Sequence, residues 1–160
     1  MQADAPAAPA GYAPHEIRTG EPTRSARLKW VVVVEETMPE GRAVNAAVCV
    51  AAATGQAVPG LLGPDAKDAA GDCHPGLPWA GCTILAASSS QLAAIRRKAV
   101  ATAGVFVADM PSVAQNTRVY DEYLEQVSTT GTDQLSYYAV SVIGPRNTID
   151  KMVRKLALLT

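Results

Sequence analysis

The stretch WVVVVEETMPEGRAVNAAVCVAAATG, residues 30–55, decides the fold of this chain. It opens with a continuous β-branched and aromatic run, which is typical of a central strand covered on both faces of an α/β sheet. From Gly41 small residues alternate with valines, which predicts a helix packed close to the sheet, with Gly55 as its C-terminal stop. Arg42 and Asn45 therefore begin a helix at the carboxyl end of a strand, where open α/β sheets bind ligands.

The composition is that of one globular domain. The chain has 160 residues and 48% hydrophobic content, so a single domain with a substantial core is expected. Its 14 Lys and Arg residues nearly balance 15 Asp and Glu residues, which excludes a global positive field for nucleic acid. Cys49, Cys73 and Cys82 show no C-x-x-C spacing and favour free thiols in a reducing cytosol. We expect a cytoplasmic protein without membrane contact, because no targeting pattern or membrane-length apolar run is recognisable.

Residues 1–24 are rich in alanine and proline and show no apolar periodicity. Such a segment buries too little apolar surface to offset its conformational entropy. We therefore expect a flexible leader over residues 1–24, able to drape over the domain, and a folded domain over residues 25–160.

The rest of the chain alternates between strand and helix patterns. Ser88 and Gln91 match a capping box, which places a helix start between two predicted strands. This alternation predicts a single three-layer α/β domain with a four-stranded mixed sheet and helices on both faces. After residue 55 the predicted strands cover residues 82–87, 105–108 and 137–143, and the predicted helices cover residues 88–104, 118–127 and 149–156.

A long irregular stretch, residues 56–80, contains the densest group of acid, base and metal-ligand side chains. Loops of this length are either functional or disordered, and the content of this one favours function. Carboxylate and imidazole groups suit zinc or iron, but aspartate is also common in turns, so we expect no metal here. His74 is the best general acid–base candidate, or else an anchor paired with an aspartate. The group comprises Asp65, Asp68, Asp72, Cys73 and His74.

Asp109 closes the third predicted strand, beside the expected ligand corner. Shielded from water, its carboxylate could act as general base or accept hydrogen bonds from a substrate; the alternative is a turn cap before Pro111. The neutral polar side chains that follow are suited to orienting a small polar ligand, or else belong to a capped helix. They are Gln115, Asn116, Thr117, Tyr120 and Tyr123.

Arg42 and Asn45 lie one helical turn apart and could together grip an anion or an amide. Alternatively, Arg42 pairs with an acidic neighbour and Asn45 satisfies loop backbone. The expected site therefore combines these two residues with Asp109, with residues 115–117 and with His74, brought over by the long loop.

The order of these parts resembles the second, archaeal and eukaryotic-type, family of peptidyl-tRNA hydrolases. The most specific piece is VSVIGPRNTIDKMVRKLALL, residues 140–159, where that family has a strand ending in I-G-P, a helix beginning I/V-D-K and a final L-K-L-L. The details are closer still to an uncharacterised bacterial domain family that shares this fold. Its motifs correspond to G-x-x-x-N at residues 41–45, L-x-G-x-D-x-x-D-x-x-G-x-x-H at residues 61–74 and A-Q-x-T at residues 114–117.

The resemblance implies a hydrolase-type fold over residues 29–159 apart from the long loop, but several hydrolase residues are replaced. Arg42 stands at the catalytic lysine, Ala46 at a glutamine and Cys49 at a histidine of the family's first helix. Asp109 corresponds to the family's aspartate, but the Gly and Arg of its D-A-G-R-T motif are absent. Arginine is a poor proton-transfer group, so these replacements argue against peptidyl-tRNA hydrolysis.

The leading functional hypothesis is an enzyme that uses acid–base chemistry, without a cofactor, on a small carboxylate- or amide-bearing metabolite. Hydrolysis, cyclisation and acyl transfer all fit the residues. A non-catalytic ligand-binding module of the same fold is the second hypothesis. The third is residual action on peptidyl- or aminoacyl-tRNA, in which basic residues contact the phosphates. These residues are Arg96, Arg97, Lys98, Arg146, Lys151, Arg154 and Lys155. The sequence leaves open whether the chain forms a homodimer.

Overall fold

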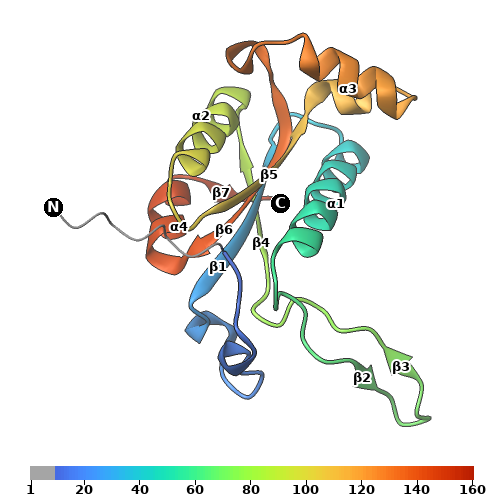
Figure 1. Cartoon of the computed structure of the whole chain (residues 1–160), viewed down its shortest axis with the longest axis vertical. Helices are drawn as coiled ribbons and strands as arrows, with labels where there is room; N and C mark the ends of the chain where they lie inside the picture. The colour runs from blue at the N-terminus through green and yellow to red at the C-terminus, as the bar shows by residue number, and fades with distance from the viewer. Residues whose placement is uncertain (1–9) are drawn as a thin grey trace, which may run out of the picture.

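The computed structural model describes residues 10–160, which fold around a five-stranded mixed sheet with the order β5-β6-β1-β4-β7 (Figure 1). β1 pairs with β4 in parallel and with β6 in antiparallel orientation, while β5 and β7 form antiparallel edges. The α/β class and the mixed sheet are confirmed. The strands are β1 (Leu28–Glu35), β4 (Thr83–Ala87), β5 (Phe106–Pro111), β6 (Tyr137–Pro145) and β7 (Ala157–Leu158).

The predicted strand count of four is wrong because of β7. The last helix ends at Val153, and the chain then returns along the edge of β4. A strand of two residues is too short to show alternation, so the sequence pattern left residues 157–158 unassigned after the predicted helix of residues 149–156.

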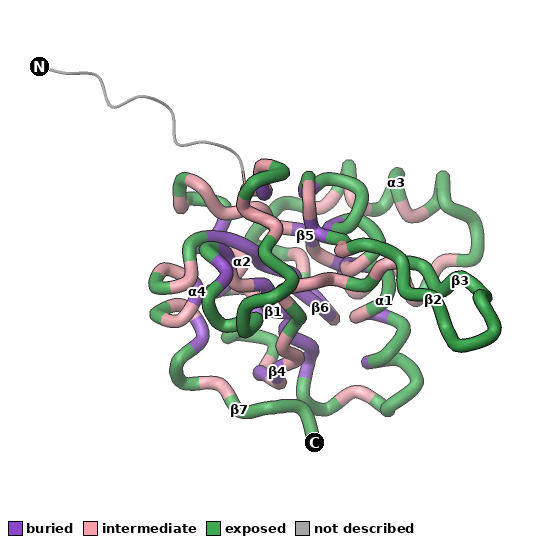
Figure 2. The backbone as a smooth tube through the Cα atoms, turned by 90° about the horizontal axis from the view of Figure 1, so that it is seen from below, coloured by how far each residue is buried: buried purple, intermediate pink, exposed green. Residues whose placement is uncertain are grey.

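β1 is buried on both faces, as its apolar run predicts. Val32 and Val34 belong to the core beneath α1 (Glu40–Ala57), whereas Val31 and Val33 belong to the core beneath α2 (Ser89–Val100) and α4 (Arg146–Val153). The buried residues of Figure 2 accordingly follow the strands through the middle of the molecule. Helices thus cover both faces of the sheet, and the capping box at the start of α2 is confirmed.

A buried polar chain links α1 to the sheet. The indole Nε1 of Trp30 donates to Ser141 Oγ at 2.8 Å, and Ser141 Oγ lies 2.7 Å from Thr54 Oγ1. The hydroxyl of Thr54 also donates to the carbonyl of Val50 at 2.7 Å. Because these buried polar groups are paired, the small residues of α1 can approach the sheet without leaving unsatisfied groups. The helix continues through Gly55 to Ala57, two residues beyond the predicted stop.

The connection between α1 and β4 leaves the sheet at the end opposite to the start of α1. β1 and β4 are parallel, so α1 must carry the chain back to the amino ends of the strands before β4 begins. There the chain forms a projecting hairpin, β2 (Ala66–Lys67) paired with β3 (Cys73–His74) (Figure 1). The prediction that this loop carries His74 to the carboxyl ends of the strands is therefore wrong.

The N-terminal segment packs on the domain from residue 10 onward. It contains the short 3-10 helices η1 (Pro14–Glu16) and η2 (Thr23–Ser25). Tyr12 is buried, donates its hydroxyl to the Leu28 carbonyl at 3.2 Å and packs its ring 4.9 Å from that of Trp79. Residues 10–24 thus drape over the domain, as the sequence allowed, and their flexibility stays a prediction. Residues 1–9 of the predicted leader lie outside the described residues.

Replacing Tyr12 tests the role of this segment. The Tyr12→Ala variant is expected to lose about 3 kcal/mol or more of unfolding free energy in urea denaturation, because a buried aromatic ring is removed. Tyr120→Ala is the matched control, since the Tyr120 side chain is 73% exposed and its loss should cost roughly 0.5 kcal/mol or less. Equal effects of the two changes would mean that residues 10–27 do not stabilise the domain.

Candidate functional site

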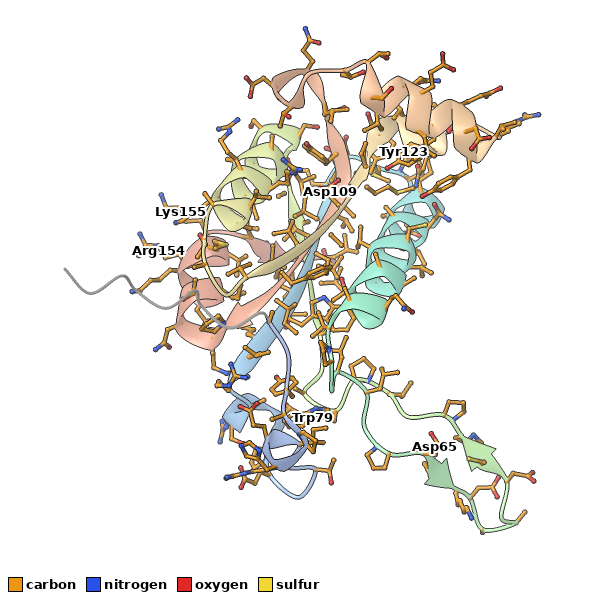
Figure 3. The ribbon with its side chains drawn as sticks, in the orientation of Figure 1. Asp65, Trp79, Asp109, Tyr123, Arg154 and Lys155 are labelled. Atoms are coloured by element: carbon orange, nitrogen blue, oxygen red, sulfur yellow. The ribbon has the colours of Figure 1, made fainter. Side chains whose placement is uncertain are left out.

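A cleft of about 500 Å³ lies at the carboxyl end of β5. One wall is α1, and the other consists of the 3-10 helix η3 (Ser112–Gln115) and α3 (Tyr120–Ser128). Figure 3 shows Asp109 and Tyr123 at this end of the molecule. The lining residues are Asn45, Cys49, Val50, Ala53, Asp109, Met110, Ala114, Thr117, Arg118, Val119, Tyr120 and Tyr123.

Asp109 lies within β5 rather than after it, and it is ion-paired. Arg96 of α2 donates from Nε to Asp109 Oδ2 at 3.0 Å, and the guanidinium also lies 5.5 Å from the centre of the Tyr137 ring. The Asp109 side chain is 20% exposed and that of Arg96 is 27% exposed. Within residues 10–160 the contact with Arg96 is the one hydrogen bond of the Asp109 side chain, so Oδ1 has no protein partner there.

Helical periodicity predicts that Arg96 lies on the water-facing side of α2, and this prediction is wrong. Asp109 follows the same alternation as Val107, whose side chain packs on the α2 face of the sheet. A carboxylate on that face attracts the nearest cation of α2. Because β5 is an edge strand, Asp109 also reaches the cleft on the other side.

Gln115 sets the orientation of Asn45. The amide Nε2 of Gln115 donates to the Arg42 carbonyl at 3.0 Å and to Asn45 Oδ1 at 3.1 Å. A carbonyl can only accept, so the Gln115 atom beside it must be the nitrogen, and the Asn45 atom facing that nitrogen must be the oxygen. The Nδ2 group of Asn45 is thereby left as a hydrogen-bond donor for the cleft.

Tyr123 gives the cleft a protonated phenol. Burial raises the pKa of Tyr123, and the neighbouring Tyr120 and Asp109 raise it further. The ring packs edge-on against Tyr120 with the centroids 5.4 Å apart. At neutral pH the Tyr123 hydroxyl therefore keeps its proton and can donate it.

The structure brings together most of the predicted site. Asn45, Asp109, Thr117 and Tyr120 line the cleft, and Gln115 supports it from behind. Arg42 contributes its backbone carbonyl to Gln115, while its side chain does not line the cleft. Asn116 is exposed outside the lining.

Sequence reasoning missed Arg96 and Arg118 as residues of this site. The role of Arg96 was not predicted because helical periodicity indicates which residues of a helix face the core. It does not indicate which residue of a strand each of them contacts. Arg118 follows Thr117 directly, and its place in the A-Q-x-T-R segment was the available signal.

The polar residues of the projecting hairpin serve its own geometry. Asp68 Oδ1 accepts from the backbone of Ala70 at 2.9 Å and of Asp72 at 3.0 Å, and Asp68 Oδ2 lies 3.4 Å from His74 Nε2. The backbone N–H of Asp72 and the His74 ring lower the pKa of Asp68. Asp65 accepts from the Gly76 backbone at 2.8 Å. His74 is thus a loop anchor, the alternative reading of its sequence context.

Within residues 10–160, no group of three or more His, Cys, Asp or Glu side chains is arranged to hold a metal ion. In the same residues, no helix combines the length and the apolar character that crossing a bilayer requires.

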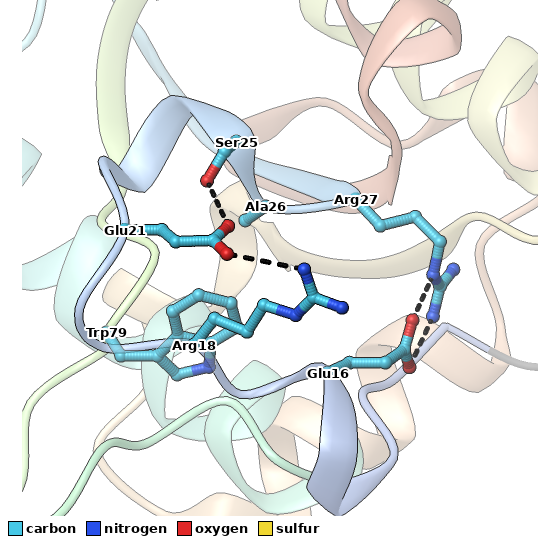
Figure 4. Close-up of a pocket in the computed structure, with 7 residues that line it drawn as sticks. All are labelled: Glu16, Arg18, Glu21, Ser25, Ala26, Arg27 and Trp79. Atoms are coloured by element: carbon cyan, nitrogen blue, oxygen red, sulfur yellow. Dashed lines mark hydrogen bonds and ion pairs between the residues drawn. The ribbon is translucent and has the colours of Figure 1, made fainter.

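A second hollow, of about 190 Å³, lies between the N-terminal segment and Trp79 (Figure 4). Its charged groups satisfy one another, because Arg18 pairs with Glu21 at 3.3 Å and Arg27 pairs with Glu16 at 2.6 Å. This Arg27 pairing lowers the pKa of Glu16 to about 2. With its polar groups already paired, this hollow is a weaker ligand site than the cleft.

Comparisons with known proteins identify a family and a similar solved structure. Residues 28–160 match the model of the family described as "Protein of unknown function (DUF2000)". The chain belongs to this family. The solved structure of Atu0240, a protein of unknown function from Agrobacterium tumefaciens strain C58, is similar with a TM-score of 0.71 and 15% identity, covering 84% of this chain and 98% of that one. At this identity the likeness shows the fold alone. A comparison with curated proteins finds no match.

A double-mutant cycle tests the ion pair between Arg96 and Asp109 in this member of the DUF2000 family. Arg96→Gln, Asp109→Asn and the double variant are expected to give a coupling of about 1 kcal/mol or more in unfolding free energy, because both side chains are largely shielded from water. The exposed pair of Arg18 and Glu21 is the control and should give roughly 0.5 kcal/mol or less. Equal couplings in urea denaturation would show that Arg96 does not hold Asp109.

Proposed function

We propose that the cleft binds a small metabolite carrying an amide or carboxylate group and that Asp109 acts on this metabolite by acid–base chemistry. The hydrogen bonds of Gln115 carry the proposal. They leave Nδ2 of Asn45 as an available donor, and the pairing with Arg96 leaves Oδ1 of Asp109 as an available acceptor, on two residues that line the cleft. A ligand that offers both an acceptor and a donor satisfies both groups, and an amide offers a carbonyl oxygen beside an N–H.

The remaining walls favour a small amphipathic molecule. Val50, Ala53 and Met110 give the cleft an apolar side. Arg118 is an exposed cation at its rim and can pair with a carboxylate. A cleft of this kind, mostly apolar with a few oriented polar groups, is typical of metabolite sites.

Asp109 and Tyr123 supply the two proton-transfer roles. The carboxylate can take a proton from a nucleophile, and the protonated phenol of Tyr123 can give one to a leaving group. His74 takes no part, because it lies in the hairpin at the other end of the sheet. The reaction classes that fit are hydrolysis, cyclisation and acyl transfer, without a cofactor.

The second candidate is a binding module without chemistry. The ion pair of Asp109 with Arg96 favours it, because a carboxylate held by an arginine is less free to move toward a substrate. Under this alternative the cleft retains its ligand unchanged.

Residual action on peptidyl-tRNA is the least favoured candidate. It would go with a fold of the peptidyl-tRNA hydrolase type, which is likewise only a proposal. The correspondence of Asp109 with the hydrolase aspartate supports it. Two of the basic residues suggested for phosphate contact are engaged elsewhere, since Arg96 pairs with Asp109 and Arg146 donates to the Ala26 carbonyl at 3.2 Å. The others are Arg97, Lys98, Lys151, Arg154 and Lys155.

Exchanging the donor of the cleft for an acceptor tests the binding mode. The protein is incubated with a metabolite extract, and the bound molecule is identified by native mass spectrometry. Asn45→Asp is expected to weaken its binding by about tenfold or more, because Nδ2 becomes an oxygen that faces the ligand acceptor. Asn116→Asp introduces the same charge outside the cleft and should leave binding unchanged. Similar losses in both variants would contradict the proposed orientation.

Removing the Asp109 charge separates catalysis from binding. The extract is followed by mass spectrometry for compounds that the wild-type protein consumes, and Asp109→Asn should slow that consumption by about 100-fold or more. Asp150→Asn, which breaks the ion pair with Lys29 on another part of the surface, is the control and should leave it unchanged. A wild-type protein that binds a compound and never converts it would favour the binding module.

A further inference from the structure

We propose that this chain forms a dimer in which the projecting hairpin of each copy docks into a basic groove of the other. The hairpin arm is defined here as residues 62–78, bounded by the bridge between Leu62 and Pro78. The basic groove is the hollow of about 300 Å³ between α2 and α4. This inference does not depend on the function of the cleft.

The hairpin arm is ordered but packs on nothing. Every residue from 64 to 75 is exposed, and Figure 2 shows the arm as a continuous exposed loop beyond the body. Leu77, at its base, is 77% exposed. A lone two-stranded hairpin is marginally stable in water, and this one relies on the backbone contacts of Asp65 and Asp68 for its shape. An arm built this way gains its packing surface only on a partner.

The tip of the arm has a definite chemical character. Residues 68–72, DAAGD, place two alanines between Asp68 and Asp72 at the turn. Three aspartates stand against one lysine in residues 64–75, so the arm is acidic. The expected partner surface is therefore apolar at its floor and cationic at its rim.

The basic groove matches this description. Its floor contains Ala94, Ile95 and Met152, and its rim carries four cations. Within residues 10–160 none of these cations forms an ion pair. The four are Lys98, Lys151, Arg154 and Lys155.

The arm and the groove of one chain cannot meet. Figure 3 shows Asp65 of the arm and Arg154 and Lys155 of the groove on opposite sides of the molecule. A second copy is thus the partner that the charges on this chain specify. With two-fold symmetry each arm enters the groove of the other copy, and the two identical contacts close the dimer.

Charge exchange tests the proposal on the full chain. Analytical ultracentrifugation at low salt is expected to show a dimer that weakens as salt rises, since the contact is electrostatic. Asp72→Lys, in the arm, and Lys155→Glu, in the groove, should each raise the dimer Kd by about tenfold or more through like-charge contacts. Mixing the two variants should restore the dimer, because each arm then meets a groove of opposite charge.

The controls keep the outcome decisive. Arg97→Glu changes an exposed cation of α2 outside the groove and should leave the dimer intact. Circular dichroism of each variant checks that these surface changes leave the fold unchanged. A wild-type protein that is monomeric at low salt, or a mixture of variants that stays monomeric, would overturn the proposal. If Lys155→Glu weakened the dimer and Asp72→Lys did not, the proposal would also be overturned. The groove would then be assigned to an acidic partner other than the hairpin arm.

Discussion

The two-sided burial of β1 is the constraint on which the rest of the molecule depends. A strand covered on both faces needs helices on both sides, and its parallel neighbour β4 can be reached only by a crossover. α1 is that crossover. It leaves the carboxyl ends of the strands and delivers the chain to their amino ends, so the molecule has two chemically different ends. The cleft between α1 and α3 lies at one end, and the hairpin arm projects from the other. Figure 1 shows α3 and the hairpin at opposite ends of the molecule.

The sequence predicted what depends on local pattern. The apolar run of β1, the capping box of α2 and the strand of β6 are each visible in neighbouring residues, and all three are present. The cleft was found for the same reason, because Asn45 and Asp109 each adjoin a strand–helix junction. The predictions that failed depended on how elements distant in the sequence are placed relative to one another. β7 gains its strand character only from pairing with β4, and Arg96 finds Asp109 only when α2 is laid across β5.

His74 shows how a topological rule could have corrected a chemical one. A group of aspartates with a histidine looks like a functional site whenever composition alone is considered. The group nevertheless lies between a crossover helix and the next parallel strand, and that connection always emerges at the amino ends of the strands. The polar side chains there hydrogen-bond to the backbone of a tight hairpin, where Asp68 accepts hydrogen bonds from two backbone N–H groups. Position in the topology thus outweighs the identity of the residues.

The cleft owes its chemistry to polar groups held from outside it. Gln115 belongs to η3 and Arg96 to α2, yet the first turns the amide of Asn45 and the second occupies one oxygen of Asp109. Each interaction leaves a single free atom of defined role, a donor on Asn45 and an acceptor on Asp109. Side chains fixed in this way lose little entropy when a ligand arrives, which raises affinity without adding contacts. If the cleft binds the proposed metabolite, the supporting residues would determine its specificity as much as the residues that line it.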